Sequence, residues 1–276
     1  MEESENYVKL IPPTAAIKEA CLDFGDGAKY AATHLTEVTG LSECESYWEG
    51  TRLHFLTESI QPEIKSPTRP RAMLLFSNPH PQSVRNGLFM SEKHSIRFWE
   101  ILCPNLGINN RIRWDDKNSI QEMVTLLMNG NYEGPLLFFE CLYQIPSKSP
   151  EVLRKLFENT DDFRCYLHAP SLARIKEILS THNIKSVLVF KGDTFESIVG
   201  KRGISKGSRQ TLRSAVKNAA GDERLFWECM DKHELRKQVP DLKHECIAIK
   251  VMDTRVKNAT FLHVLDYALQ YASIES

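Results

Sequence analysis

Three short runs of consecutive apolar residues constrain the fold of this chain more than any other feature. They occupy residues 72–76, 135–139 and 186–190, and none of them alternates with polar residues. Such a run is typical of a strand whose sheet is covered on both faces, as parallel sheets are. A fourth and less apolar run, at residues 246–251, is expected nearer an edge. The sequence therefore predicts a central, mostly parallel sheet of four strands.

Segments with helical spacing separate these runs. The predicted helices cover residues 119–128, a segment that starts at Ser149-Pro150, residues 172–179 and residues 262–271. Strands that alternate with helices predict a three-layer α/β/α arrangement. We expect a single α/β domain divided into a helical N-terminal extension (1–70), a core (71–200), a basic loop (200–222) and a C-terminal strand and helix (223–276).

The overall charge excludes a polybasic coat protein. The chain has 35 Lys and Arg against 36 Asp and Glu, a net charge of −1, and 42% of its residues are hydrophobic. The acidic first residues predict no secretory signal, and the longest apolar runs are too short for a membrane span. Seven scattered cysteines without a Cys-x-x-Cys pair indicate reduced thiols. We expect a monomer in the cytoplasm, or in the nucleus of a eukaryote.

The loops after the strands are where function is expected, because parallel α/β sheets bind ligands at the carboxyl ends of their strands. After the first run, prolines at positions 79 and 81 flank His80 and follow Asn78, and Gly87 precedes Phe89. This loop is interpreted either as a binding loop or as a rigid surface loop with a buried phenylalanine. After the second run comes Glu140, an acid at the end of an apolar strand, which either contacts a ligand or caps a helix.

These loops resemble the motifs of the uracil-DNA glycosylase superfamily, most closely its single-strand-selective monofunctional branch. The family pattern Gly-Met-Asn-Pro-Gly-Pro…Gly-x-Pro-Phe is matched by Phe76-Ser77-Asn78-Pro79-His80-Pro81…Gly87-Leu88-Phe89. The pattern His-Asn-Cys-Phe-Pro-Leu-Cys-Pro is matched by Phe139-Glu140-Cys141-Leu142-Tyr143-Gln144-Ile145-Pro146. The resemblance covers about residues 70–200, and its strength lies in the order and spacing of the motifs.

The resemblance implies a role for each matched residue. Asn78 would hold the attacking water, and Phe89, or Met90 beside it, would stack on a flipped base. Glu140 stands where the family has an asparagine that reads uracil. An ionised glutamate only accepts hydrogen bonds, so a base other than uracil is implied.

The C-terminal match departs further from the family. Asp253 stands where the family has a histidine that stabilises the departing base, and a carboxylate cannot donate a hydrogen bond to an anion. Arg255 or His80 would supply that function instead, and a solvated surface role is the alternative for both. Gln144 replaces a cysteine of the iron–sulfur members, so we predict neither a cluster nor another cofactor or metal.

A basic segment after the third strand is the predicted DNA contact. Residues 200–217 hold six Lys or Arg and no acid. Glycines and serines between the charges suit a loop that contacts phosphates, and a solvated loop is the alternative. The predicted DNA-binding residues are Lys201, Arg202, Lys206, Arg209, Arg213, Arg255 and Lys257.

The sequence thus predicts a DNA glycosylase of base-excision repair that flips a damaged or deaminated base and hydrolyses its N-glycosidic bond. The alternative is a nucleic-acid or nucleotide binder of the same fold that has lost the chemistry. An ordinary α/β hydrolase is disfavoured because the chain has no Gly-x-Ser-x-Gly, Walker or Gly-x-Gly-x-x-Gly motif.

Overall fold

A computed structural model of the chain describes residues 10–42, 45–92, 95–109, 112–200, 217, 219, 222–251 and 259–274, with the backbone alone for 259–263. Its larger sheet is mixed and has five strands in the order β5-β4-β6-β8-β7. Strands β5, β4, β6 and β8 are parallel to one another, and β7 is antiparallel to β8. These strands are β4 (Arg71–Phe76), β5 (Leu136–Cys141), β6 (Ser186–Val189), β7 (Arg236–Gln238) and β8 (Ile247–Lys250).

The four apolar runs are all strands of this sheet, as predicted. Strands β4, β5 and β6 are buried almost throughout, which explains their uninterrupted apolar sequence. The run at 246–251 does not lie at the edge, because the short strand β7 covers β8. The sheet therefore has one strand more than the sequence predicts.

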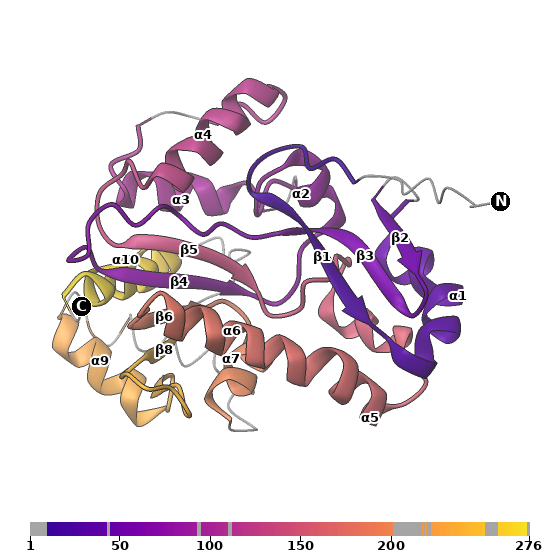
Figure 1. The fold of residues 1–276 in the computed structure, drawn as a ribbon. Coiled ribbons are helices and arrows are strands. Elements are labelled where there is room, and N and C mark those ends of the chain that lie inside the picture. Colours follow the sequence, from indigo (N-terminus) through magenta and orange to yellow (C-terminus); the bar gives the residue numbers. More distant parts are fainter. Residues whose placement is uncertain are drawn as a thin grey trace.

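Helices pack against both faces of this sheet (Figure 1). On one face, Leu74, Phe139 and Leu188 join a core with residues of α3, α4, α9 and α10. On the other face, Met73, Phe138 and Val187 pack with residues of α6 and α7. The helices named here are α3 (Arg97–Asn105), α4 (Lys117–Asn129), α6 (Ala169–Thr181), α7 (Gly192–Val199), α9 (Glu223–Lys232) and α10 (Ala259–Ile274).

The remaining described helical segments are α1 and several short ones. The segment that starts at Ser149-Pro150 is a 3₁₀ helix, and the one that precedes α6 is a π helix. These segments are η1 (Gly25–Gly27), α1 (Ala28–Thr39), α2 (Pro81–Asn86), η2 (Pro150–Leu156), α5 (Thr160–Asp162) and η3 (Phe163–His168).

The N-terminal 70 residues are not a helical extension, and this part of the prediction is wrong. The described residues from position 10 to 70 include a second, antiparallel sheet of β1 (Ile17–Asp23), β2 (Ser46–Glu49) and β3 (Arg52–Glu58), with α1 as their long helix. Buried Leu53 and Phe55 alternate with exposed or half-buried Arg52 and His54, which is a strand period. A two-residue loop with Gly50 at φ +59° joins β2 to β3, a geometry that glycine favours.

The two sheets meet at the carboxyl ends of the parallel strands. Figure 1 shows β4 and β5 pointing toward the small sheet. After β3 the chain continues to Ile60, whose backbone exchanges two hydrogen bonds of 2.9 Å with Phe139 of β5. The end of β3 is thereby fixed beside the end of β5.

Candidate functional site

Two neighbouring hollows open at the carboxyl ends of β4, β5 and β6. The smaller has a volume of about 110 Å³ and the larger about 1020 Å³, and Ser77 and Pro150 line both. The smaller hollow, called here the small pocket, is lined by Glu58, Phe76, Ser77, Asn78, His80, Ser83, Phe89, Met90, Glu92, Ser95, Cys141, Ser147, Lys148, Ser149, Pro150, Phe190 and Lys191. Four of the predicted site residues, namely Asn78, His80, Phe89 and Met90, are among them.

Asn78 follows β4 and is held in one orientation by the loop after β5. Its Nδ2 donates to the carbonyl oxygens of Ser147, at 2.8 Å, and Pro79, at 3.0 Å. It also donates to Ser147 Oγ at 2.9 Å. Because only the NH₂ group can face two carbonyl oxygens, Oδ1 points the other way. Oδ1 is thus the atom with which Asn78 can accept a hydrogen bond from a water or a ligand.

His80 is the N-cap of α2 and has a defined tautomer. Its Nδ1 accepts a hydrogen bond from the backbone N–H of Gln82 at 3.2 Å, and Pro81 occupies the first helical position. Burial lowers the pKa of His80, and this outweighs the nearby Glu92 carboxylate, which raises it. The neutral ring therefore carries its proton on Nε2, which makes Nε2 a hydrogen-bond donor.

Aromatic rings make one side of the small pocket flat and apolar. Phe76 and Phe190 stack at 4.7 Å between ring centroids and 5° between planes. Phe89 lies against Phe76 at 5.6 Å and is 1% exposed. Met90 follows with φ +53°, a left-handed backbone that costs a side-chain-bearing residue energy. These surfaces suit a small planar ligand.

Glu58 is a pocket residue that the sequence analysis missed. It is the last residue of β3 and is 2% exposed. Among the described residues nothing hydrogen bonds to its Oε1, and full burial raises the pKa of the carboxyl well above its ordinary value. A signal is present in the sequence, because Glu58 follows the segment 53–57, in which Leu53, Phe55 and Leu56 are apolar. The prediction of a helical N-terminal extension hides it.

Glu140 does not line the small pocket, contrary to the base-reading role given to it. Its fully buried carboxylate pairs with Arg174 Nη1 at 2.8 Å and accepts hydrogen bonds from Ser59 Oγ, at 2.6 Å, and Gln61 Nε2, at 2.8 Å. Successive residues of a strand point to opposite faces of the sheet. Phe139 and Cys141, on either side of Glu140, both belong to the core that packs against α3, α4, α9 and α10. Its side chain therefore points to the other face, where it joins a buried ion pair.

The remaining predicted site residues lie outside the part of the chain that the structure describes. They are Asp253, Arg255 and Lys257 near the C-terminus, and Lys201, Arg202, Lys206, Arg209 and Arg213 of the basic segment. Gly200, the first residue of the basic segment, lines the larger hollow. The basic segment thus begins at the edge that carries both hollows.

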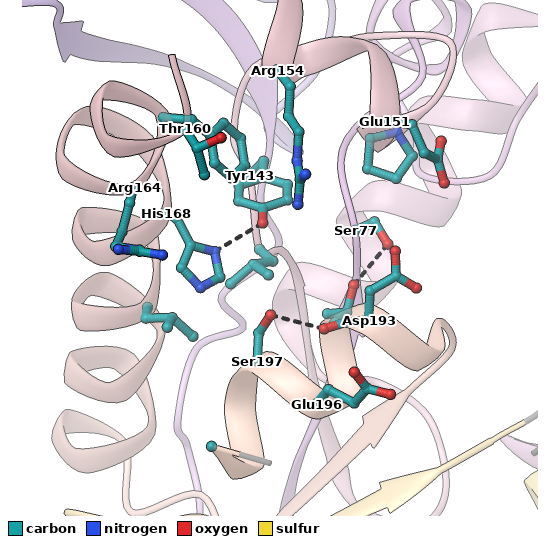
Figure 2. A pocket seen from close by; sticks show the side chains of 16 residues that line it. Ser77, Tyr143, Glu151, Arg154, Thr160, Arg164, His168, Asp193, Glu196 and Ser197 are labelled. Carbon is teal, nitrogen blue, oxygen red and sulfur yellow. Dashed lines mark hydrogen bonds between the residues drawn. The ribbon is translucent and has the colours of Figure 1, made fainter. Parts of the chain in front are cut away.

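The larger hollow has a basic wall and an acidic wall (Figure 2). Arg154, Arg164 and His168 belong to η2 and η3, and Tyr143 Oη lies 2.9 Å from His168 Nδ1. The opposite side carries Glu151, Asp193 and Glu196. Burial, and then the two arginines, lower the pKa of His168, while burial raises the pKa of Tyr143 to about 12. The basic wall suits an anionic group.

The described part of the chain supplies no group of three or more His, Cys, Asp or Glu arranged to hold a metal ion. No helix in the described ranges is long and apolar enough to cross a membrane.

A comparison with models of known protein families finds no match, and neither does a comparison with curated proteins.

Proposed function

We propose that this chain is a DNA glycosylase-like protein that binds a flipped base in the small pocket and hydrolyses its N-glycosidic bond. The observation that carries the proposal is the convergence of Asn78, His80, Phe89 and Met90 on one small, partly aromatic hollow. The sequence motifs select these four residues, and the side chains of all four line the same hollow. A hollow at the carboxyl ends of parallel strands is also where such folds bind ligands.

The proposed reaction needs a water, a path for one proton and a stabilised leaving group. Asn78 Oδ1 accepts a hydrogen bond from the water and aims its oxygen at C1′ of the sugar. The C1′–N bond breaks, the base leaves with the electron pair, and the water loses one proton to the base or to solvent. An amide is too weak a base to take that proton, so Asn78 positions the nucleophile.

The departing base requires a hydrogen-bond donor. The His80 ring is neutral near pH 7 because burial lowers its pKa. Its Nε2–H can donate a hydrogen bond to a base carbonyl that gains negative charge. The stacked pair Phe76–Phe190 and the neighbouring Phe89 offer apolar contacts to the ring.

The larger hollow would bind the DNA backbone next to the flipped base. Arg154 and Arg164 lie on its basic wall, next to the small pocket through the shared Ser77 and Pro150. Guanidinium groups bind phosphate oxygens well and without regard to base sequence. The basic segment that starts at Gly200 would add further phosphate contacts.

The test is release of a base from oligonucleotides that contain uracil, hypoxanthine, xanthine or an alkylated base, single-stranded and duplex. Release of at least one base by the wild-type chain, lost in Asn78→Ala, is expected. Salt-dependent binding of oligonucleotides without release of any base would instead favour the non-catalytic binder. The carboxylate of Asp253, where the family has a histidine, is the observation that favours this second candidate.

A further inference from the structure

Glu58 lines the small pocket at the end of the second sheet, and hydrogen bonds hold the residues on both sides of it. Thr57 Oγ1 donates to the carbonyl of Gln144 at 2.6 Å, and Ser59 N donates to the carbonyl of Ala16 at 2.9 Å. The Ile60–Phe139 bridge follows directly. The neighbouring Ser59 side chain bonds to Glu140 on the far side. Glu58 is therefore fixed toward the pocket side by residues that are themselves hydrogen bonded.

Two buried polar groups of the small pocket have no partner in the described part of the chain. They are Glu58 Oε1 and Ser83 Oγ, on side chains that are 2% and 1% exposed. A buried polar group without a hydrogen bond lowers stability, and proteins retain few of them. Two such groups in one pocket of about 110 Å³ are therefore available for hydrogen bonds to a ligand.

We propose that Glu58, as a neutral carboxylic acid, reads the ligand of the small pocket through an edge that places one donor beside one acceptor. A carboxylic acid offers one O–H and one carbonyl oxygen side by side, so its complement is an acceptor next to a donor. The lactam edges of uracil, hypoxanthine and xanthine have this pattern. The inference rests on the proposed function in taking the pocket as a base site, and it assigns to Glu58 the reading role first given to Glu140.

The protonation state follows from the surroundings of Glu58. Burial is the cause of its raised pKa, and the thiol of Cys141, which also lines the pocket, carries no charge at neutral pH because burial raises its pKa as well. The charged and titratable groups of the lining are His80, Glu92, Lys148 and Lys191. An ionised carboxylate would instead select an edge with two donors, such as N1–H and N2–H₂ of guanine, and would therefore prefer guanine to hypoxanthine. A neutral acid meets both bases through the same O6 and N1–H edge and gains nothing from the extra amine.

Free bases test the inference without requiring catalysis. Wild type, Glu58→Gln, Glu58→Met and Ser83→Ala are titrated with uracil, hypoxanthine, xanthine and guanine by calorimetry. Glu58→Gln keeps one donor and one acceptor, so it should bind lactam bases within about threefold of wild type. Glu58→Met keeps the shape but not the hydrogen bonds, and should bind at least about tenfold more weakly. Ser83→Ala should weaken binding by a smaller factor.

Controls separate binding from folding. Glu63→Met changes an acid that is 66% exposed and outside the pocket lining, and should bind like wild type. Thermal unfolding verifies that each variant is folded, and Glu58→Met should unfold no earlier than wild type. Equal affinity of Glu58→Met and wild type, tighter binding of guanine than of hypoxanthine, or no binding of any base to wild type would overturn the inference.

The inference and the proposed function can fail separately. If oligonucleotides release a base equally fast with wild type and Glu58→Met, the hydrolytic function is supported and the role of Glu58 is rejected. If free lactam bases bind in a Glu58-dependent manner and no oligonucleotide is cleaved, the role of Glu58 is supported and hydrolysis is rejected.

Discussion

Glu58 and Glu140 are two buried carboxyl groups about which opposite predictions follow. Glu140 has Arg174, Ser59 and Gln61 as partners, whereas Glu58 Oε1 has none in the described ranges. A paired buried acid contributes to the fold and is costly to disturb. An unpartnered one lowers stability, and its retention needs another reason.

Removal of Arg174 should therefore destabilise the chain strongly. Arg174→Met leaves the fully buried Glu140 carboxylate without its cation, at a cost of about 3 kcal/mol in the free energy of unfolding. The double variant Arg174→Met/Glu140→Met should recover part of this loss, because apolar residues can replace a buried ion pair. Denaturant titration of both variants measures the effect. Equal midpoints for Arg174→Met and wild type would show that the ion pair is not formed.

Replacement of Glu58 should have the opposite effect on stability. Glu58→Met removes an unsatisfied polar group and should raise the free energy of unfolding by about 1 kcal/mol at neutral pH. Because its folded pKa is raised, Glu58 stays protonated in the folded chain while it ionises in the unfolded chain. Wild type should therefore lose stability as pH rises from the ordinary glutamate pKa toward the raised value.

This pH dependence is opposite to that expected for Asp23 and Glu45, described carboxyl groups whose pKa is lowered by hydrogen bonds, in Glu45 despite burial. The difference in unfolding free energy between Glu58→Met and wild type should grow with pH across that window and be constant above it. A difference that is flat, or that shrinks as pH rises, would contradict the burial of an unpartnered carboxyl at this position.

Among the elements, the short helix α2 connects the loop that carries Asn78 to Phe89 and Met90 of the small pocket. It begins at the His80 cap and ends at Gly87, whose φ is +84°. A Cβ at position 87 would lie 2.4 Å from Cγ2 of Thr14, and Thr14 Oγ1 donates to the Gly87 carbonyl. Glycine is thus required here for both its backbone angle and the close approach of Thr14.

Gly87→Ala should consequently be more damaging than an alanine at a comparable helix end. Gly40 ends α1 with φ +65°, and a Cβ added there would meet nothing within 4 Å among the described residues. Gly40→Ala therefore carries the backbone strain alone, about 1–2 kcal/mol. Gly87→Ala should lose more stability than this and should also weaken base binding. Equal losses in thermal unfolding of the two variants would mean that the Thr14 contact can relax freely.

His80 combines a capping role and a proposed catalytic role, which substitution can separate. Asparagine is as good an N-cap as any residue, whereas alanine at this position costs about 1 kcal/mol of stability. His80→Asn should keep the stability of wild type and lose most of the base release. His80→Ala should lose both. Unchanged base release by His80→Asn would limit His80 to capping α2.

The elements differ in how well the sequence reveals them. Burial on both faces makes β4, β5 and β6 continuous apolar runs, so these strands are predicted within one or two residues. Strand β7, Arg236-Lys237-Gln238, has no buried face and three polar residues, and only its pairing with β8 defines it. The small sheet escapes prediction because its alternation is partial and because β1 lies far from its partner β3 in sequence.

The same reason limits what the sequence reveals of the pocket. Asn78, His80, Phe89 and Met90 follow one predicted strand, so position along the chain is sufficient to find them. Glu58 joins them only because the chain after β3 pairs with β5, a tertiary contact that no local pattern contains.

At the scale of the whole molecule, the net charge of −1 hides an uneven distribution. If the basic segment contacts phosphates, Lys201→Ser/Arg202→Ser should weaken oligonucleotide binding for all sequences alike. The slope of log affinity against log salt should fall by about 2. Lys65→Ser/Lys243→Ser is the matched control, since these exposed lysines lie in the loops that lead into β4 and β8, at the other edge of the sheet. Equal slopes for the two double variants would exclude the basic segment from the interface.

The central claim is that Asn78 in the small pocket holds the water that hydrolyses the N-glycosidic bond. The most direct measurement is single-turnover release of the preferred base by wild type, Asn78→Ala and the exposed control Asn118→Ala. Asn78→Ala should release the base at least about 100-fold more slowly, with oligonucleotide affinity close to that of wild type, and Asn118→Ala should match wild type. Equal rates for Asn78→Ala and wild type, or no release by wild type from any substrate, would contradict the claim.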